Sequence, residues 1–340
     1  MKTVRTISAA LFFLSIICIG QTPTGLHLVK KTLVGGEGGW DYLTVDSKAR
    51  RVYVTHSDKV VVLDADSLTV VGEVPKGDGL HGVAIAEESG HGFASNGRPS
   101  TVSMFDLKTL AVIKEIPTAQ KPDAILYDPA SKRVFAMCGQ GECASVIDPV
   151  TGTVVDSIPL GGGPEFGVAD GEGHVYVNIE DRSELVAIDS RAGKVIKRWS
   201  IAPGEEPSGL SMDAQHRRLF SVCRNKLMVV SDADSGKVVA TLPIGSGVDG
   251  CGFDPGTQTV FSSNGEGTMT VVHENSPASF VVLENALTQR GARTVAVDPV
   301  SHSVFTATAE FGPAPAPTAD RPRPRPPILP NTFVVLKYQR

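Results

Sequence analysis

The chain has 340 residues, with 32 Lys and Arg against 37 Asp and Glu, so its formal net charge is −5. An acidic chain has no general attraction to nucleic acid, which argues against DNA or RNA as a partner. A chain of this length usually forms two domains, unless one closed repeat architecture spans it.

The first twenty residues, MKTVRTISAALFFLSIICIG, predict a secretory signal peptide. Two cations, Lys2 and Arg5, precede an apolar run of about a dozen residues, which is too short to span a bilayer. We expect cleavage after Gly20, which leaves residues 21–340 as a periplasmic or secreted protein with no membrane span. A lipoprotein anchored through Cys18 is the alternative. Such signals require a small residue before the Cys, but this chain has Ile17 there.

The chain then repeats one pattern seven times. In the first copy, runs of β-branched and aliphatic residues bounded by Asp, Ser and Gly predict strands at 42–45, 52–55, 59–63 and 69–74. An acidic or small residue ends the first strand of each copy about every 42 residues, at Asp46, Ala86, Asp128, Asp170, Asp213, Asp254 and Asp298. Seven four-stranded units predict an all-β fold, a seven-bladed β-propeller with antiparallel blades. A helical solenoid has similar periods, but residues 26–310 lack helical apolar spacing.

The seventh copy lacks its outermost strand. Its first two strands are expected at 294–297 and 303–308, and its third at 333–337, close to the end of the chain. The segment 26–36 matches the outer strand and exit loop of the other copies. We therefore expect the N-terminal strand to close the last blade, so that residues 21–340 form a single propeller.

A Pro-rich insertion, residues 311–331, interrupts this last blade. Pro at this density favours extended polyproline II conformation and prevents strand pairing. The insertion leaves from the rim that carries the polar residues described below, so Arg321, Arg323 and Arg325 could reach over it as a lid. A surface loop or a segment that docks a partner is the alternative.

Four cysteines remain after cleavage. Cys138 and Cys143 flank a hairpin of the third copy, within disulfide reach of each other, and an exported compartment favours oxidation. We expect a disulfide between them. Cys223 and Cys251 lie on adjacent blades, and we interpret them as small buried hydrophobic residues rather than as a second bridge.

Polar residues are expected at one rim of the propeller. The first strand of each blade lines the central channel, and the rim is the usual site of function. Five residues before the Asp46-type position the copies have Asp41, His81, Asp123, Glu165, Ser208, Asp249 and Arg293. Antiparallel pairing predicts a second ring opposite the first, which includes His56 opposite Asp41, Asn96 opposite His81 and Asn264 opposite Asp249. Trp40 could stack on a sugar or aromatic ligand, or pack against a neighbouring blade.

Four carboxylates at one channel mouth repel one another, and they require cations, protons or an Arg partner. Arg293 supplies one positive charge. A divalent metal ion is the candidate cofactor, with Asp41, His56, His81 and Asp123 as its ligands. A solvated acidic funnel without a bound ion is the other interpretation.

Several segments resemble the YVTN-type repeat of bacterial propellers. The echoes include RVYVTH at 51–56, SVIDPVTGTVVDSIPLG at 145–161 and VVSDADSGKVVATLPIG at 229–245. The resemblance covers essentially the whole chain after the signal, which is similar to the YncE-like family of exported YVTN-repeat β-propeller proteins. It implies the fold and implies little about activity. Departures from the repeat include His56, His81 and Arg293.

The sequence leaves two functions open. The first, which we favour, is an exported binding module that recognises a small molecule or a protein through the polar, acidic funnel, because no nucleophile, base and acid set is recognisable. The second is a metal-dependent hydrolase or lyase of the lactonase type. In that case a cation in the funnel would polarise a carbonyl, and a carboxylate or His would move a proton.

Overall fold

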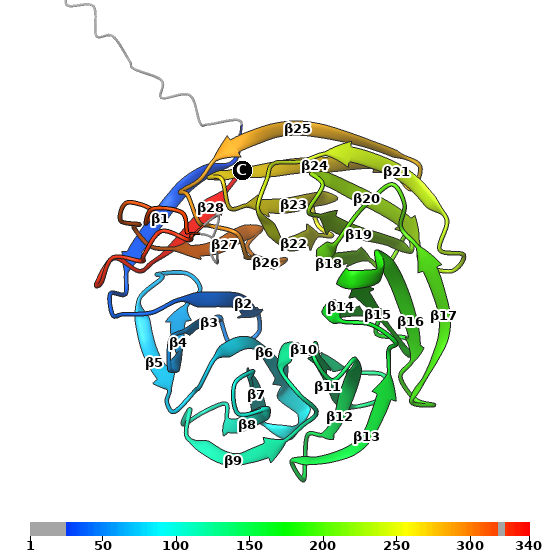
Figure 1. Ribbon diagram of the computed structural model, residues 1–340, viewed down its shortest axis with the longest axis horizontal. Coiled ribbons are helices and arrows are strands. Elements are labelled where there is room, and N and C mark those ends of the chain that lie inside the picture. Colours follow the sequence, from blue (N-terminus) through cyan, green and yellow to red (C-terminus); the bar gives the residue numbers. More distant parts are fainter. Residues whose placement is uncertain (1–24, 319–323) are drawn as a thin grey trace, which may run out of the picture.

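A computed structural model describes residues 25–318 and 324–340. It confirms the predicted seven-bladed β-propeller: seven four-stranded antiparallel sheets surround a central axis (Figure 1). In six blades the strands follow the chain order from the inner to the outer edge. The predicted signal peptide, residues 1–20, lies outside the described residues.

The blades are numbered from the first complete one. Blades 1 to 3 consist of β2 (Trp40–Asp46), β3 (Arg51–His56), β4 (Lys59–Asp64) and β5 (Val70–Val74); β6 (Leu80–Ala86), β7 (His91–Asn96), β8 (Thr101–Asp106) and β9 (Val112–Pro117); and β10 (Pro122–Asp128), β11 (Arg133–Cys138), β12 (Cys143–Asp148) and β13 (Thr153–Pro159). Blades 4 and 5 consist of β14 (Pro164–Ala169), β15 (His174–Ile179), β16 (Glu184–Asp189) and β17 (Lys194–Ser200); and β18 (Pro207–Asp213), β19 (Arg218–Cys223), β20 (Leu227–Asp232) and β21 (Val238–Pro243).

Blades 6 and 7 consist of β22 (Val248–Asp254), β23 (Thr259–Asn264), β24 (Thr268–Ser276) and β25 (Ser279–Leu287); and β26 (Val295–Asp298), β27 (Ser303–Thr308), β28 (Val334–Gln339) and β1 (His27–Leu33). The helices of the described residues are two short 3₁₀ turns, η1 (Glu87–Ser89) and η2 (Glu180–Arg182). Neither of them is long enough to cross a membrane.

Blade 7 contains both ends of the described chain. β1 pairs antiparallel with β28 at the outer edge, from His27 opposite Gln339 to Leu33 opposite Val334. Figure 1 shows the two strands side by side although they come from opposite ends of the sequence. This confirms the prediction that the N-terminal strand closes the ring. Strand pairing thus joins the two ends of the chain without a covalent link.

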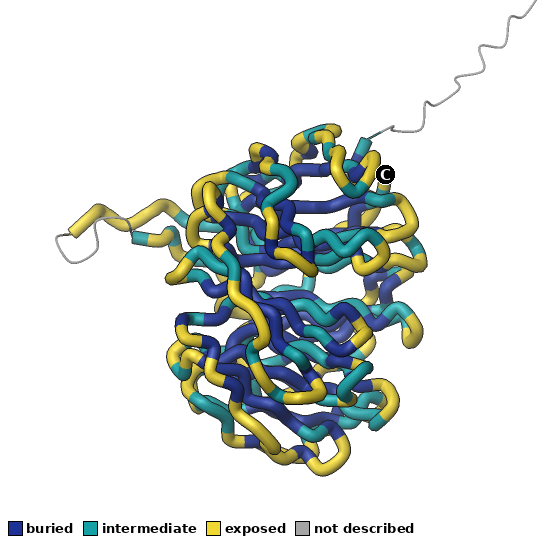
Figure 2. The backbone as a smooth tube through the Cα atoms, turned by 90° about the vertical axis from the view of Figure 1, so that its right-hand side faces the viewer, coloured by how far each residue is buried: buried dark blue, intermediate teal, exposed yellow. Residues whose placement is uncertain are grey.

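The hydrophobic core lies between neighbouring blades. One aromatic residue on the second strand of each blade is at most 2% exposed, and these residues are Tyr53, Phe93, Phe135, Tyr176, Phe220, Phe261 and Phe305. Tyr53, for example, contacts Phe105 of the next blade, with ring centroids 6.1 Å apart. Figure 2 shows that buried residues run through the strands while exposed residues concentrate at the turns. Each sheet is therefore held by the blades on either side of it.

Acidic residues at the ends of the inner strands link one blade to the next. Asp298 closes β26, and its fully buried carboxylate accepts a hydrogen bond from Arg50 Nη1 of blade 1 at 2.6 Å. Burial opposes ionisation of Asp298, but hydrogen bonds from Ser301, Ser47 and Arg50 outweigh it and lower the pKa to about 2. The Arg50–Asp298 pair thus joins the first and last blades.

The Pro-rich insertion is paired at its base, contrary to the prediction. Phe311 and Ile328 form an isolated antiparallel bridge, and the Leu329 amide donates to Glu310 O at 2.9 Å. Phe311 and Ile328 also pack against the core cluster that contains Trp40. The two apolar residues therefore anchor the insertion to the rim. Their burial compensates for the absence of further strand pairing between the two arms of the insertion.

Replacing Arg50 with Ala should destabilise the protein by about 3 kcal/mol at pH 7, because it leaves the buried Asp298 carboxylate without its cation. Urea unfolding measures this loss. The loss should shrink as the pH falls below about 4, since the unpaired carboxyl then becomes protonated. The control Arg98→Ala removes an exposed ion pair with Asp78 and should cost less than about 1 kcal/mol. Equal losses in the two variants would contradict the account.

Candidate functional site

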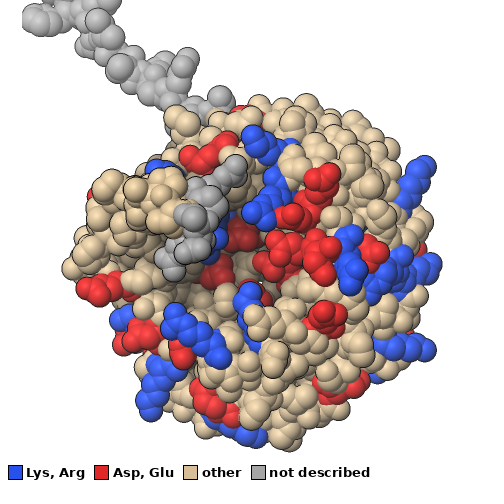
Figure 3. Space-filling model, in the orientation of Figure 1, with Lys and Arg blue, Asp and Glu red and all other residues tan. Residues whose placement is uncertain are grey.

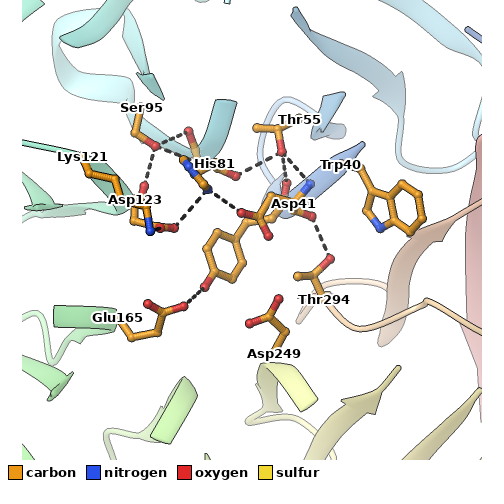
Figure 4. Close-up of polar contacts among 12 residues, drawn as sticks. Trp40, Asp41, Thr55, His81, Ser95, Lys121, Asp123, Glu165, Asp249 and Thr294 are labelled. Carbon is orange, nitrogen blue, oxygen red and sulfur yellow. Dashed lines mark hydrogen bonds and ion pairs between the residues drawn. The ribbon is translucent and has the colours of Figure 1, made fainter. Parts of the chain in front are cut away.

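The predicted first ring converges at one mouth of the central axis. Figure 3 shows acidic side chains at the centre of this face, with Lys and Arg side chains around them. The inner strands β2, β6, β10, β14 and β22 contribute the side chains of Asp41, His81, Asp123, Glu165 and Asp249. Figure 4 shows these five side chains facing one shared space. The sequence-based prediction of an acidic ring therefore matches the arrangement of these residues.

Cations from two blades connect the carboxylates of the ring. His81 Nδ1 lies 2.7 Å from Asp41 Oδ2 and 3.3 Å from Asp123 Oδ1. Arg293, in the loop before β26, donates from Nε to Asp249 Oδ2 at 2.6 Å and from Nη2 to Asp41 Oδ1 at 3.1 Å. These ion pairs join blades 1, 2, 3, 6 and 7. Glu165 of blade 4 has no cation partner among the described residues.

A backbone irregularity at the start of β2 positions Asp41. β2 pairs with β3 through Trp40 and His56, and the register shifts directly after this pair. The Asp41 amide donates to the side-chain oxygen Thr55 Oγ1 at 3.2 Å. Thr55 Oγ1 in turn donates to His81 O of the next blade at 3.1 Å. One hydroxyl group therefore fixes two neighbouring members of the ring.

The same link recurs around the propeller. A polar side chain on the second strand donates to the backbone carbonyl of the ring residue in the next blade, as in the pairs Ser95–Asp123, Asn178–Ser208 and Ser263–Arg293. The sequence-based predictions did not include these donors. Their signal is a column of polar residues one position before the predicted second ring, namely Thr55, Ser95, Asn178 and Ser263.

The predicted second ring does not line the funnel. Because of the register shift, His56 faces Trp40 instead of Asp41, and its side chain points into the core. The imidazole stacks on Phe333 with ring centroids 4.0 Å apart, and burial lowers its pKa to about 4. His56 is thus a neutral core residue, which corrects its assignment as a funnel residue and a metal ligand.

Asn96 and Asn264 also lie inside their own blades. Asn96 Nδ2 donates to Ser103 Oγ at 2.7 Å, and Asn264 Nδ2 donates to Thr270 Oγ1 at 3.0 Å. Both side chains are at most 1% exposed. They satisfy buried hydroxyl groups between strands, so they are not available to a ligand in the funnel.

Trp40 is packed between blades rather than free to stack on a ligand. It is 6% exposed, and its ring centroid lies 6.1 Å from that of Phe311 and 5.6 Å from that of Phe333. The guanidinium of Arg293 lies 5.8 Å from the centre of the indole ring. Trp40 therefore supports Arg293, which holds Asp41 and Asp249.

Tyr42 lies directly beside the ring and was not among the predicted site residues. Its hydroxyl donates to Glu165 Oε1 at 3.3 Å, from blade 1 to blade 4, and its ring meets Phe166 edge-on at 5.0 Å. The five other copies have a small residue or Thr at this position, namely Gly82, Ala124, Gly209, Gly250 and Thr294. Tyr42 and Phe166 are the two aromatic residues at this position of the repeat, and this difference from the other copies is the sequence signal that could have identified them.

The inner strands leave little room for larger side chains in that column. A Cβ atom on Gly209 would lie 2.6 Å from the backbone nitrogen of Cys251, and one on Gly250 would lie 2.6 Å from that of Val295. Adjacent inner strands therefore pack backbone to backbone at these two blades.

The charges of the ring do not balance. Four carboxyl groups share the mouth with two cations, His81 and Arg293, while Lys121 is half exposed and lies 3.7 Å from Asp123 Oδ2. Burial, and then the negative charges of Asp123 and Asp249, raise the pKa of Glu165 to about 9. At neutral pH, Glu165 therefore retains a proton.

Two other groups titrate abnormally for the same reason. Burial and the charge of Asp41 raise the pKa of Asp249 to about 6, against the opposing effect of Arg293. Burial alone would lower the pKa of His81, but the hydrogen bond to Asp41 and the charge of Asp123 outweigh it and raise the pKa. The mouth thus compensates for a shortage of cations by holding protons.

A cavity of about 970 Å³ opens at this mouth. Its walls include Asp249 and Arg293 of the ring, Ser208, Glu180, and Arg325 of the Pro-rich insertion. Arg325 thus reaches the cavity as the predicted lid requires, whereas Arg321 and Arg323 lie outside the described residues. The volume is that of a small-molecule site.

Three of the four predicted metal ligands come together. Ligand atoms of Asp41, His81 and Asp123 all lie within 4.8 Å of one another, while His56 lies apart in the core. The position between the two carboxylates is held by His81 Nδ1, whose raised pKa favours a proton there. A metal ion at this cluster would have to displace that proton.

The Cys138–Cys143 disulfide stays a prediction. The two residues face each other across β11 and β12, but both are buried free thiols. Cys138 Sγ lies 3.4 Å from Ala136 O and 3.5 Å from Ser145 Oγ, and its contact with the Cys143 thiol raises its pKa. Cys223 and Cys251 are buried free thiols, in agreement with their interpretation as small core residues.

Comparisons with known proteins identify the fold. No family profile matches the chain, and no curated protein matches its sequence. Hydrazine synthase from Kuenenia stuttgartiensis is similar in structure, with a TM-score of 0.70, 17% sequence identity, and coverage of 79% of this chain and 92% of that one. U3-55K has a TM-score of 0.73, 6% identity, and coverage of 92% and 98%. At these identities, the likeness establishes the β-propeller fold alone.

Replacing Glu165 with Gln should stabilise the protein at high pH. A folded-state pKa of about 9, above the unfolded value, means that the wild-type protein loses stability as the pH rises from about 4.5 to 9. The variant keeps the Tyr42 hydrogen bond and lacks this loss, so its thermal midpoint at pH 9 should exceed that of the wild type by several degrees. At pH 4.5 the two midpoints should agree.

Calorimetry from pH 4.5 to 9 measures this difference. Glu142→Gln changes the charge of an exposed residue and is the matched control, for which the pH profile should stay that of the wild type. If Glu165→Gln also followed the wild-type profile, the carboxyl group would not be protonated in the folded state.

Proposed function

We propose that this protein is an exported, YncE-like propeller that binds a small ligand through a positively charged group at the acidic mouth. One observation carries the proposal: four carboxyl groups of the ring converge on the mouth, where His81 and Arg293 are the cations of the ring. Asp249 and Arg293 of this ring also line the cavity that opens there. The N-terminal sequence and the YVTN-like repeat support the export and the family. The acidic ring argues against a nucleic acid as the partner.

A cationic group would supply the charge that the ring lacks. It would enter between Glu165 and Asp249, the two carboxyl groups whose pKa values burial raises most clearly. Binding would then release protons from these groups, since an adjacent positive charge lowers the pKa of a carboxyl group. Affinity should therefore rise with pH, up to the point at which the ligand itself loses its charge.

Arginines from outside the ring also line the cavity. Arg290 lies over the ring of Phe311 at 5.7 Å, and Arg325 lines the same cavity. Among the described residues, neither guanidinium has an ion pair with a carboxylate. A ligand with an anionic or polar group at its far end would gain contacts there.

The metal-dependent hydrolase or lyase is not favoured. One of its four ligands, His56, lies in the core, and Asp41 and Asp123 raise the pKa of His81, which favours its protonated form. A general base of this kind would need a free, unprotonated nitrogen near neutral pH. The ring is better suited to the recognition of charge than to proton transfer.

Isothermal titration at pH 8 with four probes of similar size tests the proposal. The dication 1,4-diaminobutane and the zwitterion 4-aminobutanoate should bind, whereas butane-1,4-diol and succinate should not. Asp249→Asn and Glu165→Gln should each weaken the binding of the dication about tenfold, since each removes one of the two carboxyl groups between which the cation enters. Asp156→Asn changes an exposed carboxylate of β13 and should leave affinity unchanged.

Two results would contradict the proposal. In the first, the neutral diol binds as well as the diamine, which would show that the mouth does not recognise charge. In the second, the diamine binds the ring variants and the wild type equally, which would place its site elsewhere. Circular dichroism of each variant checks that the propeller is intact.

A further inference from the structure

Acidic residues mark the other ends of the inner strands. One carboxylate oxygen caps the turn, and the other meets a cation of the next blade at three interfaces, in the pairs Asp298–Arg50 at 2.6 Å, Asp170–Arg217 at 2.9 Å and Asp254–His302 at 2.8 Å. The three cationic residues occupy the same position of the repeat, and all have a left-handed backbone with φ between 53° and 58°. This position supplies the cation that joins two blades.

The interface between blades 5 and 6 departs from this arrangement. Gln258 occupies the position of the cation, with φ at 51°, and supplies no charge to Asp213. Its Nε2 donates to Pro255 O at 2.9 Å, and its Oε1 is buried without a hydrogen-bond partner among the described residues. The backbone carbonyl of Gln258 accepts a hydrogen bond from the amide of Glu274. In blade 1, the carbonyl of Arg50 accepts the equivalent hydrogen bond from the amide of Ala65. A second acid therefore stands where blade 1 has an alanine.

Asp213, His216 and Glu274 form a compact cluster at this interface. His216 Nδ1 lies 2.7 Å from Asp213 Oδ2 and 3.2 Å from Glu274 Oε1. The ligand atoms of the three residues all lie within 4.8 Å of one another. Two ligand atoms that share one zinc ion, each about 2 Å from it, lie about 3.3 Å apart in a tetrahedral site. The spacing of the cluster is thus close to that of a metal site.

The carboxylate of Glu274 is buried and shares the imidazole of His216 with Asp213. The residue is 2% exposed, and within the described part of the chain neither of its oxygens has a hydrogen-bond partner. Asp213 Oδ2 and His216 Nδ1 also lack aligned hydrogen bonds. Arg218 is near, but its guanidinium pairs with Asp232 at 2.7 Å. Buried carboxylates without a cation are costly, so the cluster requires a further positive charge.

We propose that Asp213, His216 and Glu274 bind a divalent transition metal ion such as Zn²⁺. One imidazole nitrogen and two carboxylate oxygens suit this class of ion, whereas Ca²⁺ needs six or more oxygen ligands. The ion takes the structural place that a guanidinium or imidazolium takes between other blades, and it joins blade 5 to blade 6. The side chain of His216 is 28% exposed, which gives solvent ions a route to the cluster.

Metal binding to the full-length mature protein tests this site. Protein treated with a chelator and then equilibrated with Zn²⁺ should retain about one ion per chain after gel filtration, and its thermal midpoint should rise by several degrees. Glu274→Gln should abolish both effects, and it should raise the midpoint of the metal-free protein because it removes a buried charge. Asp123→Asn, which disrupts the other three-residue cluster at the funnel, should keep both effects.

A spectroscopic test does not depend on the folding of the Glu274 variant. In the Asp123→Asn background, Co²⁺ should give the visible absorption bands of an ion with nitrogen and oxygen ligands. The proposal would be overturned if the Glu274→Gln variant retained Zn²⁺ while the Asp123→Asn variant did not. A protein that binds neither ion would also overturn it and would show that Asp213 and Glu274 share a proton instead.

Discussion

The funnel depends on one hydrogen bond, which is donated by a polar side chain of the second strand to the backbone of the next blade. Thr55 shows its effect, since its hydroxyl accepts the Asp41 amide and donates to the His81 carbonyl. This bond stabilises the register shift at the start of the inner strand, and the shift turns the ring residues toward the axis while the paired residues turn into the core. The acidic mouth is thus a consequence of the way the blades are joined.

The same electrostatic constraint acts at both ends of the inner strands. At the mouth, carboxyl groups outnumber the cations, and Glu165 holds a proton in place of a positive charge. At the opposite ends, three acids meet a cation of the next blade, whereas Asp213 lies beside a second acid, Glu274. Buried acids need a proton, a basic side chain or a bound ion. Our two proposals place a ligand and a metal ion where the chain itself supplies too little positive charge.

Repeat spacing was sufficient to predict the blades, the closing strand and the acidic ring, because each depends on a pattern that recurs about every 42 residues. The second ring was wrong because a bulge moves the register by one residue, and His56 thereby enters the core. Tyr42 and the metal cluster depend on contacts between different blades, which no single repeat contains. A comparison of equivalent positions in the seven copies would have shown Gln258 and Glu274 as exceptions and thus indicated the cluster.

The central claim is that the mouth holds protons because it lacks a cation. Carbon-13 NMR of the Glu165 side-chain carboxyl group, titrated with pH and assigned through Glu165→Gln, tests this most directly. The account predicts that the group is protonated at pH 7 and titrates near pH 9, and that saturating 1,4-diaminobutane lowers its pKa. A Glu165 that is fully ionised at pH 7, with no response to the diamine, would contradict the account.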